Sequence, residues 1–525
     1  MIDINNVFIK YIRRKLFMSD VAKSKKKKMR FPTAFTVLFI VLILASVLTY
    51  IIPAGSYDRL QYDGDNNQFI RIASDGSETT LEPSQELLDE LNVTVPLENF
   101  VNGDIKKPVA IPGSYQQLEQ KPQGFGAVAR APIDGIGDSI GIIVFVLILG
   151  GCIGILNTTG TFDAGIAALS KKTKGKEFLM VTIISSIIAL GGTTFGLAEE
   201  TIAFYPILMP IFLASGYDAI VTIAAIYMGS SIGTMFSTTN AFSVVVASNA
   251  AGISFKEGMT IRIIALVLAQ VITLYYIYRY AKKVKEDPSQ SIIAEDMPRI
   301  KNQYLEGYDP ENTAPFNFRR ISMLVIFMLA FPIMIYGVMN LDWWFEEMST
   351  LFLLVAIGLM ILSGLSEQKA VNSFLEGAAD LVSVALIIGV ARAINIILDD
   401  GMISDTLLYN ASNIISGMNG VLFSTVQMVL FSFLGIFIPS SSGLATLSMP
   451  IIAPLADTVS IGRDVVVSAY NFGQGWMAII APTGLILATL EMVDVPYNKW
   501  VKFILPLMGI LLVLSVVMLG IQTVI

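Results

Sequence analysis

Two adjacent glutamates interrupt an apolar stretch near the middle of the chain. The stretch reads IALGGTTFGLAEETIAFYPILMPIFL over residues 188–213 and contains Glu199 and Glu200. A carboxylate in an apolar setting is costly unless a counter-charge or a ligand pairs with it. One of the two could attract a cationic substrate group, or carry a proton or a sodium ion. The alternative is a buried ion pair with Arg392. In a helix the two side chains point in different directions, so only one can face the site directly.

Arg392 is a second charge inside an apolar run, LIIGVARAINIILDD at 386–400. A guanidinium stays charged and binds carboxylates through a planar, two-pronged arrangement of donors. Arg392 could therefore hold a substrate carboxylate or neutralise one of the glutamates. The sequence leaves both roles open.

Uncharged ligand residues gather in four polar stretches, 191–200, 229–240, 439–446 and 471–484. Their hydroxyl and amide groups can bind a substrate or an ion without adding fixed charge. The alternative is helix packing through small residues, which is common in membrane proteins. Together with the glutamates, we expect the substrate site to contain Thr193, Thr194, Ser237, Thr238, Thr239, Asn240, Ser440, Ser441, Ser442, Asn471, Gln474 and Thr483.

The composition indicates which class of protein positions these residues. Of the 525 residues 54% are hydrophobic and only 15% are charged, against roughly 25% charged residues in soluble domains. Several stretches exceed the roughly 18 apolar residues that a membrane span needs. The chain has no histidine and one cysteine, Cys152. We therefore expect an all-α polytopic membrane protein without metal or cofactor, in which any proton coupling uses carboxylates.

The hydropathy pattern predicts about nine transmembrane helices, near 33–53, 137–157, 218–250, 259–280, 321–341, 349–365, 380–398, 464–488 and 500–522. Two further apolar segments, 178–213 and 420–459, each contain a polar turn. We interpret them as re-entrant hairpins, because irregular backbone at membrane depth must be buried in protein or line a cavity. Gly196 and Gly443 at the tips should need the backbone freedom of glycine. The alternative is two ordinary crossings joined by a short turn.

The positive charges predict the orientation. With the N-terminus inside, the cytoplasmic segments hold 25 of the 35 lysines and arginines, in agreement with the positive-inside rule. Residues 1–30 then form a basic cytoplasmic N-terminus, with Met18 as an alternative start. Residues 54–131 form an extracytoplasmic loop or small cap. We expect a multi-pass protein of a bacterial plasma membrane with a cytoplasmic N-terminus and an extracytoplasmic C-terminus.

The chain contains a weak internal repeat. DGIGDSIGIIVFVLILGGCIGILNTTGTF at 134–162 matches EGAADLVSVALIIGVARAINIILDDGMI at 376–403, and GLA and MPI recur in the same order further on. In the predicted topology the copies 132–281 and 366–525 have opposite orientations, which is the layout of many secondary transporters. The first transmembrane helix, 31–53, precedes the first copy, and 282–365 holds a cytoplasmic linker and two connecting helices. Chance similarity between apolar segments is the alternative.

Four segments resemble a known family. FPTAFTVLFIVLILASVLTYIIPAGSYDR, GGCIGILNTTGTFDAGI, GGTTFGLAEETIAFYPILMPI and FIPSSSGLATLSMPIIAPLAD are similar to the YfcC-like family, over roughly residues 31–525. That family is related to the DcuC-type C4-dicarboxylate carriers of the ion transporter superfamily. The resemblance implies two inverted repeats with re-entrant hairpins, an elevator-like transport domain and secondary active transport. Some members resemble arginine/ornithine exchangers, whereas the DcuC-type carriers handle succinate and fumarate.

The residues favour an amino acid exchanger of the arginine/ornithine type that works by alternating access. Two glutamates suit a basic side chain, while a dicarboxylate would need cationic groups. The alternative is a carboxylate transporter coupled to H⁺ or Na⁺. A channel would need a continuous polar path, and an intramembrane enzyme would need a nucleophile–base pair, so both are disfavoured. The expected partners are a small molecule and the lipid bilayer, with no nucleic acid, and a homodimer is left open.

Overall fold

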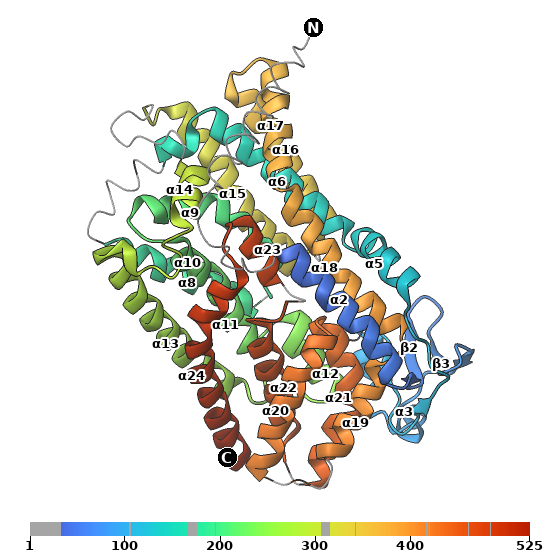
Figure 1. Cartoon of the computed structure of the whole chain (residues 1–525). Helices are drawn as coiled ribbons and strands as arrows, with labels where there is room; N and C mark the ends of the chain where they lie inside the picture. Colours follow the sequence, from blue (N-terminus) through green and yellow to red (C-terminus); the bar gives the residue numbers. More distant parts are fainter. Residues whose placement is uncertain are drawn as a thin grey trace. The chain divides into compact units, whose positions relative to one another are not determined.

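Long apolar runs form the long helices of this protein, because a helix satisfies its own backbone polar groups in an apolar medium. The computed structural model describes residues 33–103, 105, 107–165, 168, 176–194, 196–305, 315–341, 343–415, 418, 420–459, 461–482 and 485–525. The predicted N-terminal segment 1–30 and Thr483 lie outside these residues. All elements below belong to the unit Ala34–Ile525 (Figure 1).

The protein is mostly helical. In the described part of the chain, eight helices are long and apolar enough to cross a membrane: α2 (Ala34–Ile51), α6 (Ile140–Thr158), α8 (Glu177–Thr194), α13 (Met259–Glu286), α16 (Phe345–Ser363), α18 (Val382–Asp400), α20 (Gly420–Phe437) and α24 (Tyr497–Val524). A further helix, α15 (Phe318–Asn340), has 23 residues. Helices α8 and α20 belong to the two predicted hairpin segments. The predicted spans 218–250 and 464–488 are both interrupted, within the polar stretches 229–240 and 471–484.

Two long helix pairs lie antiparallel to each other. Helix α5 (Phe125–Asp138) continues into α6 across Ser139, and α17 (Glu367–Asp380) continues into α18 across Leu381. Helix α5 packs against α18 and α6 packs against α17, and the four lie together along one side of Figure 1.

Glycines permit this close approach. The missing side chain of Gly135 faces the backbone of Gly389 and Ala393, while Gly150 and Gly154 face Gly377. Gly135 and Gly377 are also aligned in the sequence repeat, so equivalent glycines make equivalent contacts. Such small-residue seams are typical of membrane helix packing.

Each half contains a helical hairpin that packs on an interrupted helix. In the first half α8 is followed by the 3₁₀ helix η1 (Glu199–Phe204) and α9 (Tyr205–Ala214), and α8 packs on α11 (Gly229–Met235). In the second half α20 is followed by α21 (Ser441–Thr458), and α20 packs on α22 (Arg463–Ala478). The same kind of contact therefore recurs in both halves.

The interrupted helices differ in detail. In the first half α10 (Ala219–Ile223), the π-helical turn η2 (Ala224–Met228) and α11 form one helix; after a break at 236–240, the π-helical turn η3 (Ala241–Val245) and α12 (Val246–Ala250) continue. In the second half α22 is followed by α23 (Leu485–Met492). π-Helical turns are uncommon and frequently lie at functional sites.

The predicted loop or cap at 54–131 contains a small folded cap, which we define as residues 54–124. Its strands are β1 (Gly55–Ser56), β2 (Arg59–Asp63), β3 (Gln68–Ile72), β4 (Glu78–Leu81), β5 (Val109–Ala110) and β6 (Gln116–Gln117), and its helices are α3 (Gln85–Glu90) and α4 (Leu97–Val101). The larger sheet is antiparallel with the order β4-β3-β2-β5. Leu60, Phe69 and Phe100 fill its small core. Helix α5 begins at Phe125, inside the predicted loop.

A buried carboxylate fixes the cap to the helices. Asp405 in α19 (Ser404–Ile415) accepts hydrogen bonds from Arg59 at 3.1 Å and from the backbone N–H of Tyr57 at 2.9 Å. Asp405 is 4% exposed. Hydrogen bonds and ion pairs to a desolvated carboxylate are strong and costly to break.

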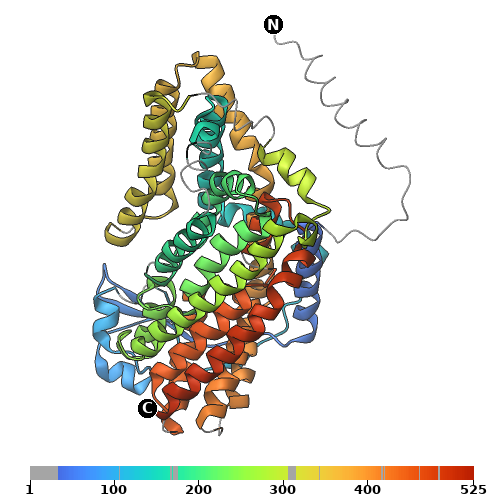
Figure 2. The same cartoon turned by 90° about the vertical axis from the view of Figure 1, so that its left-hand side faces the viewer.

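The segments that connect the long helices lie mainly at the two ends of the unit (Figure 2). At one end Lys285 pairs with Glu177 at 3.1 Å, and Arg299 of α14 (Met297–Leu305) pairs with Asp494. The short helix η4 (Pro288–Gln290) lies in the segment that connects α13 to α14.

At the other end the cap meets the second half. Arg463 donates to the Thr94 hydroxyl at 3.0 Å, and Gln522 donates to Asp464 at 2.7 Å. The last turns of α24 therefore lie near the start of α22, which contacts the cap.

Candidate functional site

Gly196 turns the chain at the end of α8. Its φ is +82°, a left-handed conformation that glycine adopts without steric cost. The N–H groups of Gly196 and Leu197 donate to the carbonyl of Gly191 at 3.1 and 3.3 Å, which satisfies a carbonyl at the helix end. A Cβ on Gly196 would lie 2.7 Å from Oδ1 of Asn240. The expectation that this tip needs a glycine is therefore confirmed in its geometry.

Hydrogen bonds fasten this first tip to the break at 236–240. The Thr193 carbonyl accepts the N–H groups of Thr238 and Thr239 at 3.2 and 3.1 Å. The Thr193 hydroxyl donates to the carbonyl of Phe236 at 3.2 Å, and the Asn240 amide donates to the carbonyl of Gly192 at 3.3 Å. The structure therefore brings the predicted residues of the first half together.

Many of these polar groups already have partners. Thr193, Ser237, Thr238 and Asn240 are buried, and the Ser237 hydroxyl donates to the carbonyl of Thr234 at 2.5 Å. Thr194 donates within α8, to the carbonyl of Leu190 at 2.6 Å, and Thr239 donates to the carbonyl of Thr194 at 3.2 Å. The geometry shows that these groups join the tip to the break, and their contact with a substrate stays a prediction.

Glu199 and Glu200 follow the first tip in the 3₁₀ helix η1, and both are half-buried. The backbone N–H of Ala198 donates to Oε2 of Glu200 at 3.1 Å. Among the residues that the structure describes, no ion pair includes either glutamate. Two adjacent carboxylates thus lie within the helical bundle without a basic counter-charge from the described chain.

Glu199 also lies near a contact between the first and the second half. It belongs to η1, which packs against η2, the turn that contains Tyr227, and against α23. The Tyr227 hydroxyl donates to the carbonyl of Ala478 at 2.8 Å, at the end of α22. The acidic tip of the first half therefore lies near the interruption that follows α22 in the second half.

Arg392 has a different partner from the one considered above. Its Nε lies 3.4 Å from Oδ2 of Asp138, across the α5–α18 contact, with side chains 42% and 50% exposed. The structure thus pairs Arg392 with an aspartate of the helix seam and with neither glutamate. A partly exposed ion pair of this kind contributes little to stability.

The second tip is built from hydroxyls at the start of α21. The Ser440 hydroxyl accepts the N–H of Gly443 at 3.2 Å and caps the helix. The Tyr470 hydroxyl donates to the Ser441 carbonyl at 2.6 Å, and the Gln474 amide donates to the carbonyl of Pro439 at 3.3 Å. Gly443 lies in the first turn of α21 and has no positive φ. The backbone conformation of Gly443 therefore does not require glycine, although a Cβ there would lie 3.0 Å from Oγ of Ser440.

Buried amides lie below this tip. The Asn471 amide donates to the Val467 carbonyl at 3.0 Å, while its Oδ1 has no partner. Gln427 of α20 is fully buried with neither amide atom paired, and sequence reasoning missed it. Buried polar atoms without partners usually hold water or a ligand. Of the predicted residues, Thr483 alone lies outside the described chain.

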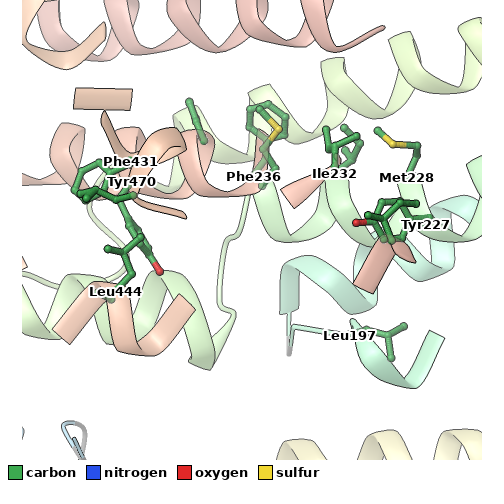
Figure 3. Close-up of a cluster of buried hydrophobic side chains, with 14 of the residues drawn as sticks. Leu197, Tyr227, Met228, Ile232, Phe236, Phe431, Leu444 and Tyr470 are labelled. Carbon is green, nitrogen blue, oxygen red and sulfur yellow. The ribbon is translucent and has the colours of Figure 1, made fainter. Parts of the chain in front are cut away.

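The two halves meet between the tips. A Cβ on Gly475 would lie 2.6 Å from Cα of Met235, and the rings of Phe236 and Phe472 are 4.8 Å apart. Figure 3 shows the apolar cluster here, with Leu197 of the first tip and Leu444 of the second on either side of Ile232 and Phe236. Two surface pockets, between α5 and α18 and between the cap and α21, are lined by other residues.

These features define a polytopic helical membrane protein with a polar tip in each half. A model of the DcuC family, C4-dicarboxylate anaerobic carrier, matches residues 31–524. The chain belongs to this family, and it is therefore a multi-pass membrane protein of a secondary-transporter family.

Two curated relatives match nearly their full length. An "Uncharacterized protein" of Haemophilus influenzae (strain KW20 / Rd) is 50% identical over 501 residues, covering 95% of this chain and 98% of the relative. The "Putative basic amino acid antiporter YfcC" of Escherichia coli (strain K12) is 31% identical over 521 residues, covering 96% and 99%.

Among solved structures, the YdaH transporter of Alcanivorax borkumensis is similar over 93% of this chain and 98% of its own, with 14% identity and a TM-score of 0.37.

Proposed function

We propose that this protein exchanges basic amino acids of the arginine/ornithine type by alternating access. The observation that carries the proposal is the pair Glu199 and Glu200, half-buried beside the first tip with no ion pair among the described residues. A guanidinium or ammonium group of a substrate would supply the missing counter-charge. The name of the E. coli relative, a putative basic amino acid antiporter, points to the same substrate class.

A C4-dicarboxylate, carried with H⁺ or Na⁺, is the second candidate. The description of the family supports it, and so does Lys107 of the cap, whose Nζ lies 2.9 Å from the Ser442 hydroxyl at the second tip. A dicarboxylate needs cations or donors, and the second tip offers both.

Counterflow in proteoliposomes decides between the candidates. Vesicles preloaded with unlabelled ornithine, arginine, alanine or succinate are given labelled arginine or labelled succinate outside. The proposal predicts that internal ornithine and arginine drive arginine uptake, whereas internal succinate and alanine do not. Uptake of succinate driven by internal succinate, without arginine uptake, would reject the proposal in favour of the second candidate.

We also propose that the tips belong to two inverted repeats whose hairpins are re-entrant. Two kinds of helix contact support this. The seams of α5 with α18 and of α6 with α17 are antiparallel and use equivalent glycines. The pairs α8–α11 and α20–α22 recur in the two halves. In such transporters the substrate lies between the repeats, near interrupted helices.

The proposed orientation, with the cap outside, has a simple test. Asp65 of the cap and Lys301 of α14 are exposed, while the single cysteine, Cys152, is fully buried. An impermeant thiol reagent added to whole cells should label Asp65→Cys and leave Lys301→Cys and the wild type unlabelled. Labelling of Lys301→Cys but not of Asp65→Cys would reverse the orientation.

A further inference from the structure

Lys107 reaches from the cap to the second tip. It precedes β5, whose residues pair with β2 in the register Arg59↔Ala110 and Leu60↔Val109. Strand β5 also packs against α21. The Lys107 ammonium donates to the Ser442 hydroxyl at 2.9 Å. A residue next to a strand of the folded cap thus brings a positive charge to a tip whose own residues, 439–443, are uncharged.

The charges around Lys107 do not balance. Among the described residues no carboxylate pairs with its ammonium group, and the Arg392 guanidinium lies close enough to repel it. Lys107 is exposed as a whole residue, but partial desolvation beside the tip and this repulsion hold its pKa below the ordinary value. Arg392 has its own partner, Asp138. An added anion would offset the unfavourable interaction of the two cations.

Other cations of the cap show what a purely structural role looks like. Arg59 pairs with the buried Asp405 at 3.1 Å, and Arg71 pairs with the buried Asp58 at 2.5 Å. Both fix the cap through carboxylates. Lys107 instead touches a hydroxyl, and an ammonium group has three donors, so two remain for an anion or for water. Because Ser442 accepts from Lys107, its own proton is also free for an anion.

We infer that Lys107 and Ser442 together bind a carboxylate of the transported substrate. This inference rests on the proposed function only in that the two tips contact the substrate, because arginine, ornithine and C4-dicarboxylates all carry carboxylates. The two tips then bind different groups of the substrate. A glutamate at the first tip binds the cationic group, and the cap and the second tip bind the carboxylate. The cap is thereby part of the binding site.

The test compares a substrate with an analogue that lacks the carboxylate. Arginine and agmatine, which is decarboxylated arginine, compete against labelled arginine in proteoliposomes with the wild type, Lys107→Met and Lys121→Met. Lys107→Met should raise the inhibition constant of arginine by roughly 10-fold or more, as expected for loss of a charge-assisted contact, and leave that of agmatine unchanged. Lys121, whose Nζ contacts the sulfur of Met402, is the matched control and should change neither.

Two further variants test the charge at position 107 and the hydroxyl at position 442 separately. Lys107→Arg should retain most of the affinity for arginine, and Ser442→Ala should lower it in the same direction as Lys107→Met. The inference would be overturned if the inhibition constants of arginine and agmatine changed equally, or if only the maximal rate changed. Lys107 would then serve only to hold the cap against the hairpin. If counterflow selects succinate, succinate and succinamide replace the two competitors, so a failure of the arginine proposal does not count against Lys107.

Discussion

The two hairpin tips have similar scaffolds and opposite chemistry. Each follows a helix of 18 residues and is anchored to an interrupted helix by a hydroxyl that donates to a tip carbonyl, Ser230 to Leu197 in the first half and Tyr470 to Ser441 in the second. The first tip then presents two glutamates without a basic partner among the described residues. The second presents serines and the ammonium group of Lys107. Two similar scaffolds thus carry groups of opposite charge at their tips.

The backbone differs as well. Gly196 has a φ of +82° and faces Asn240, whereas Gly443 is helical and faces only the Ser440 side chain. The first tip is therefore closed by a glycine turn, and the second by a helix cap. The internal repeat alone would have predicted equal sensitivity at both glycines.

The largest expected effect is at Gly196. Gly196→Ala forces an L-residue into a left-handed conformation, which costs about 1–2 kcal/mol, and places Cβ 2.7 Å from Asn240 Oδ1. We expect the exchange rate to fall at least ~10-fold, with the protein still present in the membrane. Gly443→Ala is the matched control and should retain at least about a third of the rate, because alanine is favoured in helices and its Cβ would meet only the Ser440 side chain, 3.0 Å from Oγ. The two tips would be alike if both variants lost transport to the same extent.

A smaller effect is expected at the two anchors. Ser230→Ala and Tyr470→Phe each remove one hydrogen bond, of 2.5 and 2.6 Å respectively, from a tip carbonyl. A neutral hydrogen bond contributes about 1 kcal/mol, so each exchange rate should fall about 5-fold. Rates at saturating substrate, normalised to the amount of protein, provide the measurement. A variant with the wild-type rate would show that its bond does not hold the tip during transport.

Much of the bundle could be predicted from the sequence. The span 33–53 corresponds to α2, Ala34–Ile51, and the polar stretch 229–240 contains the first break. Both follow from local patterns, a long apolar run and a cluster of small polar residues. The cap's sheet could not be predicted in the same way, because its strands have at most five residues. Short strands show little alternation.

The charge pairing was harder to predict. Nothing local indicates that Arg392 pairs with Asp138, which is distant in the sequence, or that Lys107 lies at Ser442. Both contacts depend on how separate elements pack. Lys107 also lies in a polar segment, where a lysine is ordinarily a solvated surface residue. The two glutamates could be singled out from the sequence, because a charged residue in an apolar run is costly unless it has a partner.

The most direct test of the account is whether the first tip distinguishes a cation from a neutral molecule of the same shape. Citrulline carries a neutral urea group where arginine carries a guanidinium. The inhibition constants of both are measured against labelled arginine in proteoliposomes with the wild type, Glu199→Gln and Glu200→Gln. The wild type should bind arginine roughly 10- to 150-fold more tightly than citrulline, as expected for a charge-assisted contact. One glutamine variant should lose that preference by weakening arginine alone. If both variants kept the wild-type preference for arginine over citrulline, the account would be contradicted, because neither glutamate would then bind the charged group of the substrate.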